Sequence, residues 1–283
     1  MSHHEYATPD ILVDTAWVAE HLNDPQVRLV EVDVDTSAYD TGHIAGAVGW
    51  NWKTDTQDPV RRNIPNAAAL GALLSRAGVS PDMTVVAYGD NNNWFAAYAV
   101  WLLKYFGHAD ARLMNGGRAK WLAENRPTTK DAPTVTATQY AVKAANPDLR
   151  ALRDLVLQNV QQPGSVLVDV RSPKEFSGEL LAPEGLPQEG AQRGGHIAGA
   201  VNIPWAQAVR EDNTFKSPDE LRALYEGKGV SSDKQVIAYC RIGERSAHTW
   251  FVLKYLLGYP DVRNYDGSWT EYGSLIDVPI EKG

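Results

Sequence analysis

Residues 236–246 read VIAYCRIGERS and combine the features of a strand, a loop and the start of a helix. The first four residues are apolar and partly β-branched, which is typical of a buried strand in a parallel sheet. Residues 247–257 are mostly apolar and contain no helix breaker, so they predict a largely buried helix that Gly258 and Pro260 end. Strand, loop and helix in this order form the basic unit of an α/β fold, whose functional loops lie beyond the carboxyl ends of the strands.

Cys240 is the only cysteine in the chain and lies where this predicted strand ends. The loop N–H groups, the positive end of the helix and the nearby Arg241 and Arg245 would surround its sulfur. Such a setting lowers the pKa of a thiol. A lone cysteine is more often an inert core residue, but charged residues that need water or an anion follow this one directly. We therefore predict a nucleophilic Cys240.

The composition of the chain limits the class of protein. The 283 residues suffice for two ordinary domains, and 43% of them are hydrophobic, so a proper core can form. A net charge of −8 argues against a nucleic-acid binder. No apolar run of about 18 residues predicts a membrane span, and residues 1–10 lack the features of a secretory signal. The single cysteine cannot form an internal disulfide, which fits a reducing cytoplasm, where we expect the protein.

The chain contains one long internal repeat. Residues 42–48 and 195–201 both read GHIAGAV, and a strand that ends in aspartate precedes each copy, at Asp33 and at Asp169. Further matches follow downstream: residues 85–88 with 236–239, residues 104–105 with 254–255, and Gly116 with Gly267. A period of about half the chain is too long for a solenoid and indicates two copies of one domain.

Each copy is predicted to alternate helices and strands, which indicates a mainly parallel sheet with helices on both faces. In the first copy we expect helices at 14–22, 66–77 and 94–106, and strands at 29–34, 84–88 and 111–114. In the second copy we expect helices at 148–159, 217–226 and 246–257, and strands at 165–170, 235–239 and 262–265. Asn66 is the expected cap of one helix, and Ser217 with Glu220 forms a capping box for another. The predicted domains are 1–125 and 148–283, joined by a linker at 126–147.

A second irregular stretch, residues 177–195, is rich in glycine and proline and has no counterpart in the first copy. A long loop inserted just before a shared motif is either solvent-exposed padding or part of a pocket rim.

Two GHIAGAV motifs and a strand–Cys–loop–helix segment resemble the rhodaneses, which are thiosulfate sulfurtransferases, over nearly the whole chain. The loop CRIGERS is most similar to the actinobacterial two-domain members. In that family the first domain is usually inactive, and the second carries the cysteine that forms a persulfide. The sequence agrees, because Gly89 stands in the first copy where Cys240 stands in the second. The resemblance thus implies two tandem rhodanese-like domains, of which the second is catalytic.

The resemblance also implies a two-step transfer of sulfur through Cys240. The Cys240 thiolate would take the sulfane sulfur of thiosulfate, release sulfite, and pass the sulfur to cyanide or a thiol, without a metal or an organic cofactor. Arg245 and Arg241 would hold the sulfonate oxygens, and Arg171 would have a supporting electrostatic role. The sequence has Glu175 where vertebrate members have a further substrate arginine. The expected backbone donors to the sulfur are Ile242, Gly243, Glu244 and Ser246.

Three alternatives remain open. Cysteine phosphatases use a Cys-x5-Arg loop, whereas Cys240 and Arg245 form Cys-x4-Arg, a smaller cradle that is better matched to a sulfur atom. Sulfurtransferases for 3-mercaptopyruvate typically carry a loop poor in charge, so the arginines favour thiosulfate. A sulfur carrier or a binding protein is the third alternative, and a carrier role is compatible with turnover.

The motif histidines, His43 and His196, are predicted to be structural, because one of the two copies has no nucleophile to assist. Asp33 and Asp169 are also expected to be structural. Because the duplication already provides an interface between domains, we expect a monomer, and we expect no nucleic-acid or membrane partner.

Overall fold

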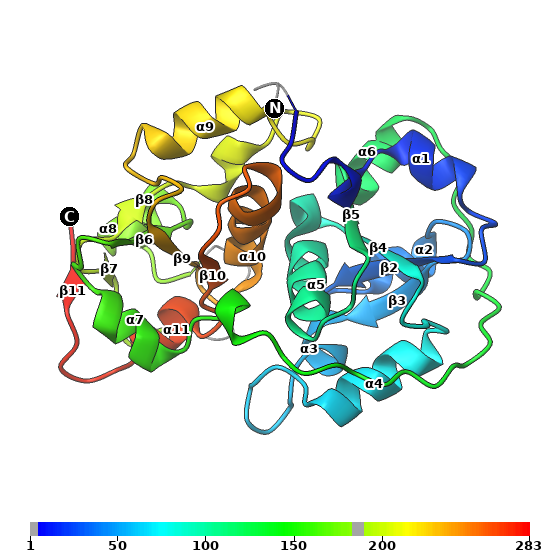
Figure 1. The fold of residues 1–283 in the computed structure, drawn as a ribbon, viewed down its shortest axis with the longest axis horizontal. Coiled ribbons are helices and arrows are strands. Elements are labelled where there is room, and N and C mark those ends of the chain that lie inside the picture. The colour runs from blue at the N-terminus through cyan, green and yellow to red at the C-terminus, as the bar shows by residue number, and fades with distance from the viewer. Residues whose placement is uncertain (1–4, 183–189) are drawn as a thin grey trace. The chain divides into compact units, whose positions relative to one another are not determined.

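The computed structural model describes residues 5–182 and 190–283, and the chain divides into two compact units. The unit that we call the first domain comprises Asp10–Asn146 and Glu211–Phe215. The second domain comprises Met1–Pro9, Pro147–Arg210 and Lys216–Gly283. Both are α/β domains in which helices accompany a parallel sheet (Figure 1).

The first domain contains a five-stranded sheet in the order β1-β5-β4-β2-β3, and all of its strand pairs are parallel. Its strands are β1 Leu12–Val13, β2 Val27–Asp33, β3 Val48–Asn51, β4 Thr84–Tyr88 and β5 Ala111–Met114. Its helices are α1 Thr15–Glu20, α2 Ser37–Thr41, α3 Trp52–Asp55, α4 Ala67–Arg76, α5 Trp94–Tyr105 and α6 Gly117–Ala123.

Alternate side chains of the inner strands of this sheet pack against helices on opposite faces. On one face, Val86 and Tyr88 join a cluster with Val18 of α1 and Trp121 of α6. Residues between them on β4 point to the other face, because side chains alternate along a strand. The helix α5 contacts this sheet and is buried all round at residues 95–103. A helix without a polar face is stable only where all of its sides are covered, which explains the apolar sequence of α5.

The second domain contains a four-stranded parallel sheet in the order β10-β9-β6-β8 and a separate antiparallel pair of β11 with β7. Its strands are β6 Ser165–Asp169, β7 His196–Ile197, β8 Val201–Asn202, β9 Gln235–Tyr239, β10 Val262–Asn264 and β11 Ile280–Glu281. Its helices are α7 Arg153–Asn159, α8 Pro173–Ser177, α9 Pro218–Glu226, α10 Glu244–Phe251 and α11 Ser268–Tyr272, and a π-helical turn at Val252–Leu256 continues α10.

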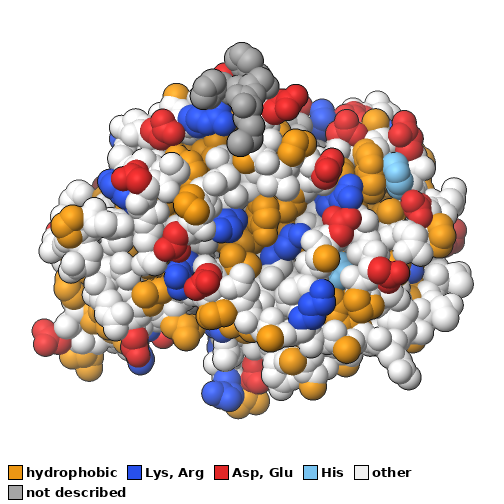
Figure 2. Space-filling model, viewed as in Figure 1, with side chains coloured by type: hydrophobic (Ala, Val, Ile, Leu, Met, Phe, Trp, Pro, Cys, Tyr) orange, Lys and Arg blue, Asp and Glu red, His pale blue; other side chains and the backbone are white. Residues whose placement is uncertain are grey.

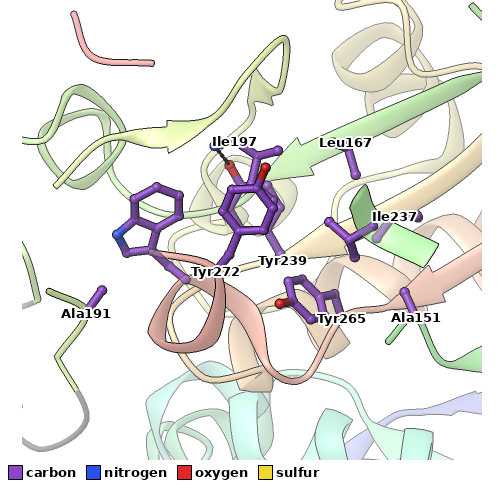
Figure 3. Packing of buried hydrophobic residues seen from close by; sticks show 10 residues of the cluster. Ala151, Leu167, Ala191, Ile197, Ile237, Tyr239, Tyr265 and Tyr272 are labelled. Carbon is purple, nitrogen blue, oxygen red and sulfur yellow. Dashed lines mark hydrogen bonds between the residues drawn. The ribbon is translucent and has the colours of Figure 1, made fainter. Parts of the chain in front are cut away.

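One buried cluster lies on a face of this second sheet. Ile237 and Tyr239 of β9 pack there with Trp269 and Tyr272 of α11 (Figure 3). The backbone N–H of Ile197 donates to the Tyr239 hydroxyl at 3.1 Å, which ties the second GHIAGAV motif to the central strand.

The helices and strands predicted from the sequence all occur, with ends that differ by a few residues. Asn66 caps α4 by accepting a bond from the N–H of Ala69, and Ser217 forms the expected capping box with Glu220. The largest difference is the helix expected at 148–159, because a 3-10 turn at Pro147–Leu149 precedes α7, which begins at Arg153. No helix among the described residues is long and apolar enough to cross a membrane.

Three segments depart from the predicted boundaries. Residues 126–146 of the predicted linker belong to the first domain, where Thr138 N–H donates to Ser75 O at 3.0 Å. Residues 211–215 also belong there, and Asp212 binds Lys120 at 3.0 Å. Residues 5–9 belong to the second domain, where Ala7 N–H donates to a carbonyl oxygen at the end of the π-helical turn.

The glycine-rich stretch at 177–195 includes residues 183–189, which lie outside the described residues. Its two ends meet in the structure. A Cβ atom on Gly194 would lie 2.6 Å from the carbonyl oxygen of Gly178, so these positions need glycine for a close backbone approach. Arg193 donates to the carbonyl oxygens of Gly273 and Leu275 and thereby fixes the returning end to the region after α11.

Candidate active site

The strand β9 ends directly before Cys240, and α10 begins at Glu244. Because β9 lies between β10 and β6, Cys240 lies at the carboxyl edge of an inner strand, where ligands bind in open α/β sheets. Gly243 has a left-handed φ of 103°, and a Cβ atom there would lie 2.7 Å from Asp266 Cα. Glycine at this position therefore lets the chain turn from strand to helix within a very short loop.

The Cys240 sulfur is completely buried and has three polar neighbours from its own loop. The Gly243 N–H donates to Sγ at 3.1 Å, and the Ser246 hydroxyl lies 3.7 Å from Sγ. The thiol itself donates to Glu244 Oε2 at 3.4 Å. The sulfur thus has two hydrogen-bond donors and one carboxylate as polar neighbours.

These surroundings raise the pKa of the Cys240 thiol rather than lowering it. Burial is the largest cause, and the Glu244 carboxylate adds to it. The charge of Arg245 and the N–H groups of Ser246 and Gly243 act in the opposite direction, as the sequence suggested, but they do not outweigh burial. The expectation of a lowered pKa is therefore wrong for this structure, in which the neutral thiol is favoured.

Arg245 forms a bidentate ion pair with Glu175. The two outer guanidinium nitrogens donate to the two carboxylate oxygens, each at 2.9 Å, and the side chains are 4% and 1% exposed. Burial alone would raise the pKa of Glu175, but the hydrogen bonds and charge of Arg245 hold it below its usual value. Glu175 also accepts a bond from Ser172 N–H and completes the capping box of α8. Arg241, the other loop arginine, is buried too.

Arg171 lies in the core beside Asp169. Its guanidinium donates to the Asp169 carboxylate at 2.6 Å and to Gly195 O at 2.7 Å, and it lies 4.7 Å from the centre of the Trp269 ring. These contacts give Arg171 an architectural role, because they tie β6 to the first residue of the GHIAGAV motif. A supporting role in catalysis stays a prediction.

Two residues that the sequence analysis did not single out hold the cysteine loop in place. The Ser268 hydroxyl accepts a bond from Cys240 N–H at 3.0 Å and donates to Tyr265 O at 2.6 Å. Asn264 accepts a bond from the Ser246 hydroxyl at 2.6 Å and donates to Gly243 O at 3.1 Å. Both lie at or after the carboxyl end of β10, the neighbour of β9, and polar residues at that position were the available signal.

The matching loop of the first domain has no room for a nucleophile. A Cβ atom on Gly89 would lie 2.4 Å from Val32 O, closer than side-chain carbons approach oxygen. The Gly89 N–H donates to Asn93 Oδ1 at 3.0 Å, so a side chain of the loop itself fills the space. In residues 5–182 and 190–283, no group of three or more His, Cys, Asp or Glu side chains could hold a metal ion.

The motif histidines make two similar contacts in both domains. The His43 ring stacks on Tyr39 with 3.9 Å between ring centres, and the His196 ring stacks on Phe176 with 3.5 Å. In each case Nδ1 lies 2.9 Å from the carbonyl oxygen of that aromatic residue. Both rings are buried, and their structural role stays a prediction.

The surface shows no large area of one charge on the face drawn in Figure 2. Basic and acidic side chains are interspersed there, with apolar side chains between them.

Comparison with known proteins gives matches over nearly the whole chain. The family model for the rhodanese-like domain matches residues 14–124 and 152–275. The sulfur carrier protein TtuD of Thermus thermophilus is 57% identical over 281 residues, which cover 98% of this chain and 99% of that protein. A Mycolicibacterium smegmatis protein with the name "Putative thiosulfate sulfurtransferase" is 54% identical over 277 residues, with 98% and 99% covered.

Solved structures share the fold. Wild-type EanB has a TM-score of 0.87 and 24% sequence identity, with 98% of this chain and 70% of that chain covered. YnjE has a TM-score of 0.86 and 25% identity, with 98% and 69% covered.

Proposed function

Because the chain belongs to the rhodanese-like domain family, we propose that it is a thiosulfate sulfurtransferase that carries sulfur as a persulfide on Cys240. The observation that supports this most directly is the position of Cys240 at the end of β9, with Gly243 N–H at 3.1 Å from its sulfur and Arg245 in the same loop. The names of the similar full-length proteins support sulfur transfer in general.

In the first half-reaction the Cys240 sulfur attacks the sulfane sulfur of thiosulfate. The thiol proton passes to Glu244 Oε2, which lies 3.4 Å away and accepts its hydrogen bond. The S–S bond of thiosulfate breaks, and sulfite leaves with the electron pair of that bond. Arg245 and Arg241 offset the negative charge of the donor, and the loop N–H groups donate to the sulfur atoms.

In the second half-reaction the acceptor attacks the outer sulfur of the persulfide. Cyanide leaves as thiocyanate, or a thiol leaves as a persulfide, and Cys240 returns as the thiolate. The two half-reactions share one covalent intermediate, so ping-pong kinetics are expected.

A sulfur-carrier role is the second candidate, and the 57% identity to the carrier of Thermus thermophilus favours it. It uses the same Cys240 persulfide and differs in the acceptor, which would be a thiol of another protein rather than a small molecule. A preference for 3-mercaptopyruvate as donor is the third candidate.

The test is the intact mass of the protein after addition of thiosulfate, with Cys240→Ser as control. The proposal expects a gain of one sulfur atom in the unaltered protein only, and its loss with formation of thiocyanate when cyanide follows. If no sulfur is gained from thiosulfate but it is gained from 3-mercaptopyruvate, the donor assignment is wrong. No gain from either donor would remove the transferase function.

A further inference from the structure

We infer that Glu175 is a positioning residue that also determines specificity, because it holds the guanidinium of Arg245 and so limits the binding of dianionic sulfur donors. This inference rests on the proposed function, since it concerns the donor that Cys240 attacks.

The guanidinium of Arg245 faces carboxylates at all three nitrogens. Its two outer nitrogens bind the Glu175 oxygens at 2.9 Å, and its Nε lies 3.5 Å from Glu244 Oε1. All three side chains are buried. Water therefore screens their charges little, and the positive charge of Arg245 is offset by two neighbouring negative charges.

A dianionic donor that approaches Cys240 meets this arrangement. To bind Arg245 through both outer nitrogens, it must displace the carboxylate of Glu175 and leave that buried charge without its partner, which is unfavourable. If Glu175 keeps its place, the donor meets a guanidinium that is already neutralised. In both cases affinity falls, and it falls more for a dianion such as thiosulfate than for a monoanion such as 3-mercaptopyruvate.

The first domain shows that the fold itself does not need this pair. Glu175 precedes Phe176, which stacks on the motif histidine, and the residue before the equivalent Tyr39 is Ala38. Arg245 lies five residues after Cys240, and the residue five positions after Gly89 is Trp94. Both members of the pair are thus absent from the domain that has no nucleophile. The pair therefore occurs in the domain that has the cysteine and is not a general feature of the fold.

Glu175 also caps α8, and the chain offers a matched control for this second role. The helices α8 and α9 begin with the same capping box, Ser-Pro-x-Glu, formed by Glu175 in one and Glu220 in the other. Glutamine at this position still accepts the capping bond. Glu175→Gln therefore removes the charge beside Arg245 while keeping the cap, and Glu220→Gln makes the same change away from the site.

The experiment compares steady-state kinetics of the full chain with Glu175→Gln and Glu220→Gln, using thiosulfate and 3-mercaptopyruvate. For Glu175→Gln we expect the thiosulfate KM to fall by about tenfold, the effect of one charge-assisted hydrogen bond gained by the donor. The change in kcat and in the 3-mercaptopyruvate KM should be smaller, so the ratio of kcat/KM for the two donors shifts toward thiosulfate. Glu220→Gln should match the unaltered protein. A folded Glu175→Gln protein with an unchanged or raised thiosulfate KM would overturn the inference.

Calorimetric titration with thiosulfate in a Cys240→Ser background measures the same effect without turnover. The dissociation constant should fall when Glu175→Gln is added. Glu175→Asp keeps the charge and the cap but is one methylene shorter, so a partial decrease in KM is expected, and it serves as the test if Glu175→Gln does not fold. If the unaltered protein gains no sulfur from thiosulfate, the proposed function fails. If it gains sulfur but neither variant binds thiosulfate more tightly, only the role of Glu175 fails.

Discussion

Both domains use a buried arginine to bind the backbone of the GHIAGAV motif, but this arginine comes from a different place in each domain. In each domain, a buried guanidinium donates to the carbonyl oxygen of the first motif glycine, Gly42 or Gly195. In the first domain this arginine is Arg118 of α6, whereas in the second it is Arg171, just after β6. The aligned position of Arg118 in the second domain is Trp269, whose ring packs under the guanidinium of Arg171.

The carboxylate partners of these arginines occupy the same place in both sheets. Glu31 lies opposite Tyr88 in the strand register, and Asp169 lies opposite Tyr239. Arg118 binds Glu31 at 2.8 Å, and Arg171 binds Asp169 at 2.6 Å. Both domains thus have a buried arginine–carboxylate pair beside the motif, although a different element supplies the arginine in each. The burial of Arg171 is thus explained by its contacts within the fold of the second domain.

The same strand register corrects one residue match between the two copies that the sequence analysis made. Asp33 and Asp169 both end a strand, but the register makes Glu31 the counterpart of Asp169 and places Asp33 at the position of Arg171. Asp33 is therefore a buried carboxyl where the second domain has a guanidinium.

The largest effect that separates the two domains is expected at the nucleophile position. Cys240→Ser should abolish persulfide formation, because no other cysteine exists in the chain. Gly89→Cys in this background should gain no sulfur from thiosulfate, since Val32 O would lie 2.4 Å from the new Cβ atom and the loop has no cationic side chain. Intact mass after incubation with thiosulfate checks both. A persulfide on residue 89 would break the distinction between an active and an inactive domain.

The next effect tests whether the two buried arginines have equal roles. Arg171→Met and Arg118→Met should each destabilise the protein by about 3–5 kcal/mol, because each leaves a buried carboxylate without its partner. Urea unfolding followed by circular dichroism measures this. Arg153→Met, which removes an exposed ion pair with Asp154 on α7, is the control and should change stability little. An Arg171→Met protein of normal stability but low activity would show that Arg171 serves catalysis instead.

A smaller effect is expected from the buried Asp33 carboxyl. Burial, with the nearby Asp90 charge, raises its pKa to about 8. In the unfolded chain the pKa is about 4, so the contribution of Asp33 to stability is complete below about pH 4 and is lost as pH rises through about 8. Asp33→Asn should remove this loss, with no advantage near pH 4 and a gain of about 2–4 kcal/mol at pH 9.

Denaturant unfolding of the unaltered protein and Asp33→Asn across this pH range provides the measurement. Asp82→Asn, which changes an exposed aspartate of the same domain, is the control. Parallel pH profiles for Asp33→Asn and the unaltered protein would contradict the prediction.

The smallest effect is expected at the residue that follows the matched glycines Gly116 and Gly267. Ser268 has a left-handed φ of 51°, and Gly117 of the first domain has 58° at the same position. Ser268→Ala should lower stability by about 1–2 kcal/mol through loss of the two hydroxyl bonds. Ser268→Gly, which copies the first domain, should cost less, because glycine adopts this backbone conformation without strain. Melting temperatures of the two variants test the order, and an equal loss would mean that the strain at Ser268 is negligible.

The elements of the fold and the cysteine loop could be predicted because their signals are local in sequence. The apolar run before Cys240, the capping residues Asn66 and Ser217, and the duplicated motif each lie within a few residues of the feature they indicate. The Glu175–Arg245 pair could not be predicted in this way, because its members are 70 residues apart and meet only after folding.

The direction of the Cys240 pKa shift was also beyond the sequence. The loop identified the groups that lower it, but the depth of burial depends on how β9 and α10 pack into the whole domain. Similarly, the residue opposite Tyr239 is set by the register of β6 and β9, which a list of strands does not contain.

The assignment of short segments to the opposite half of the chain bears on how the protein is made. The first domain includes residues 211–215, so its last contacts form only after synthesis has passed well into the second half. Residues 5–9 leave the ribosome early, yet Ala7 and Thr8 bind the carbonyl oxygens of Leu256 and Tyr255, which are made near the end. Domains generally fold as units in the order of synthesis. Here each domain includes a short segment from the other half of the chain. Neither domain can therefore complete its contacts until much of the other has been translated.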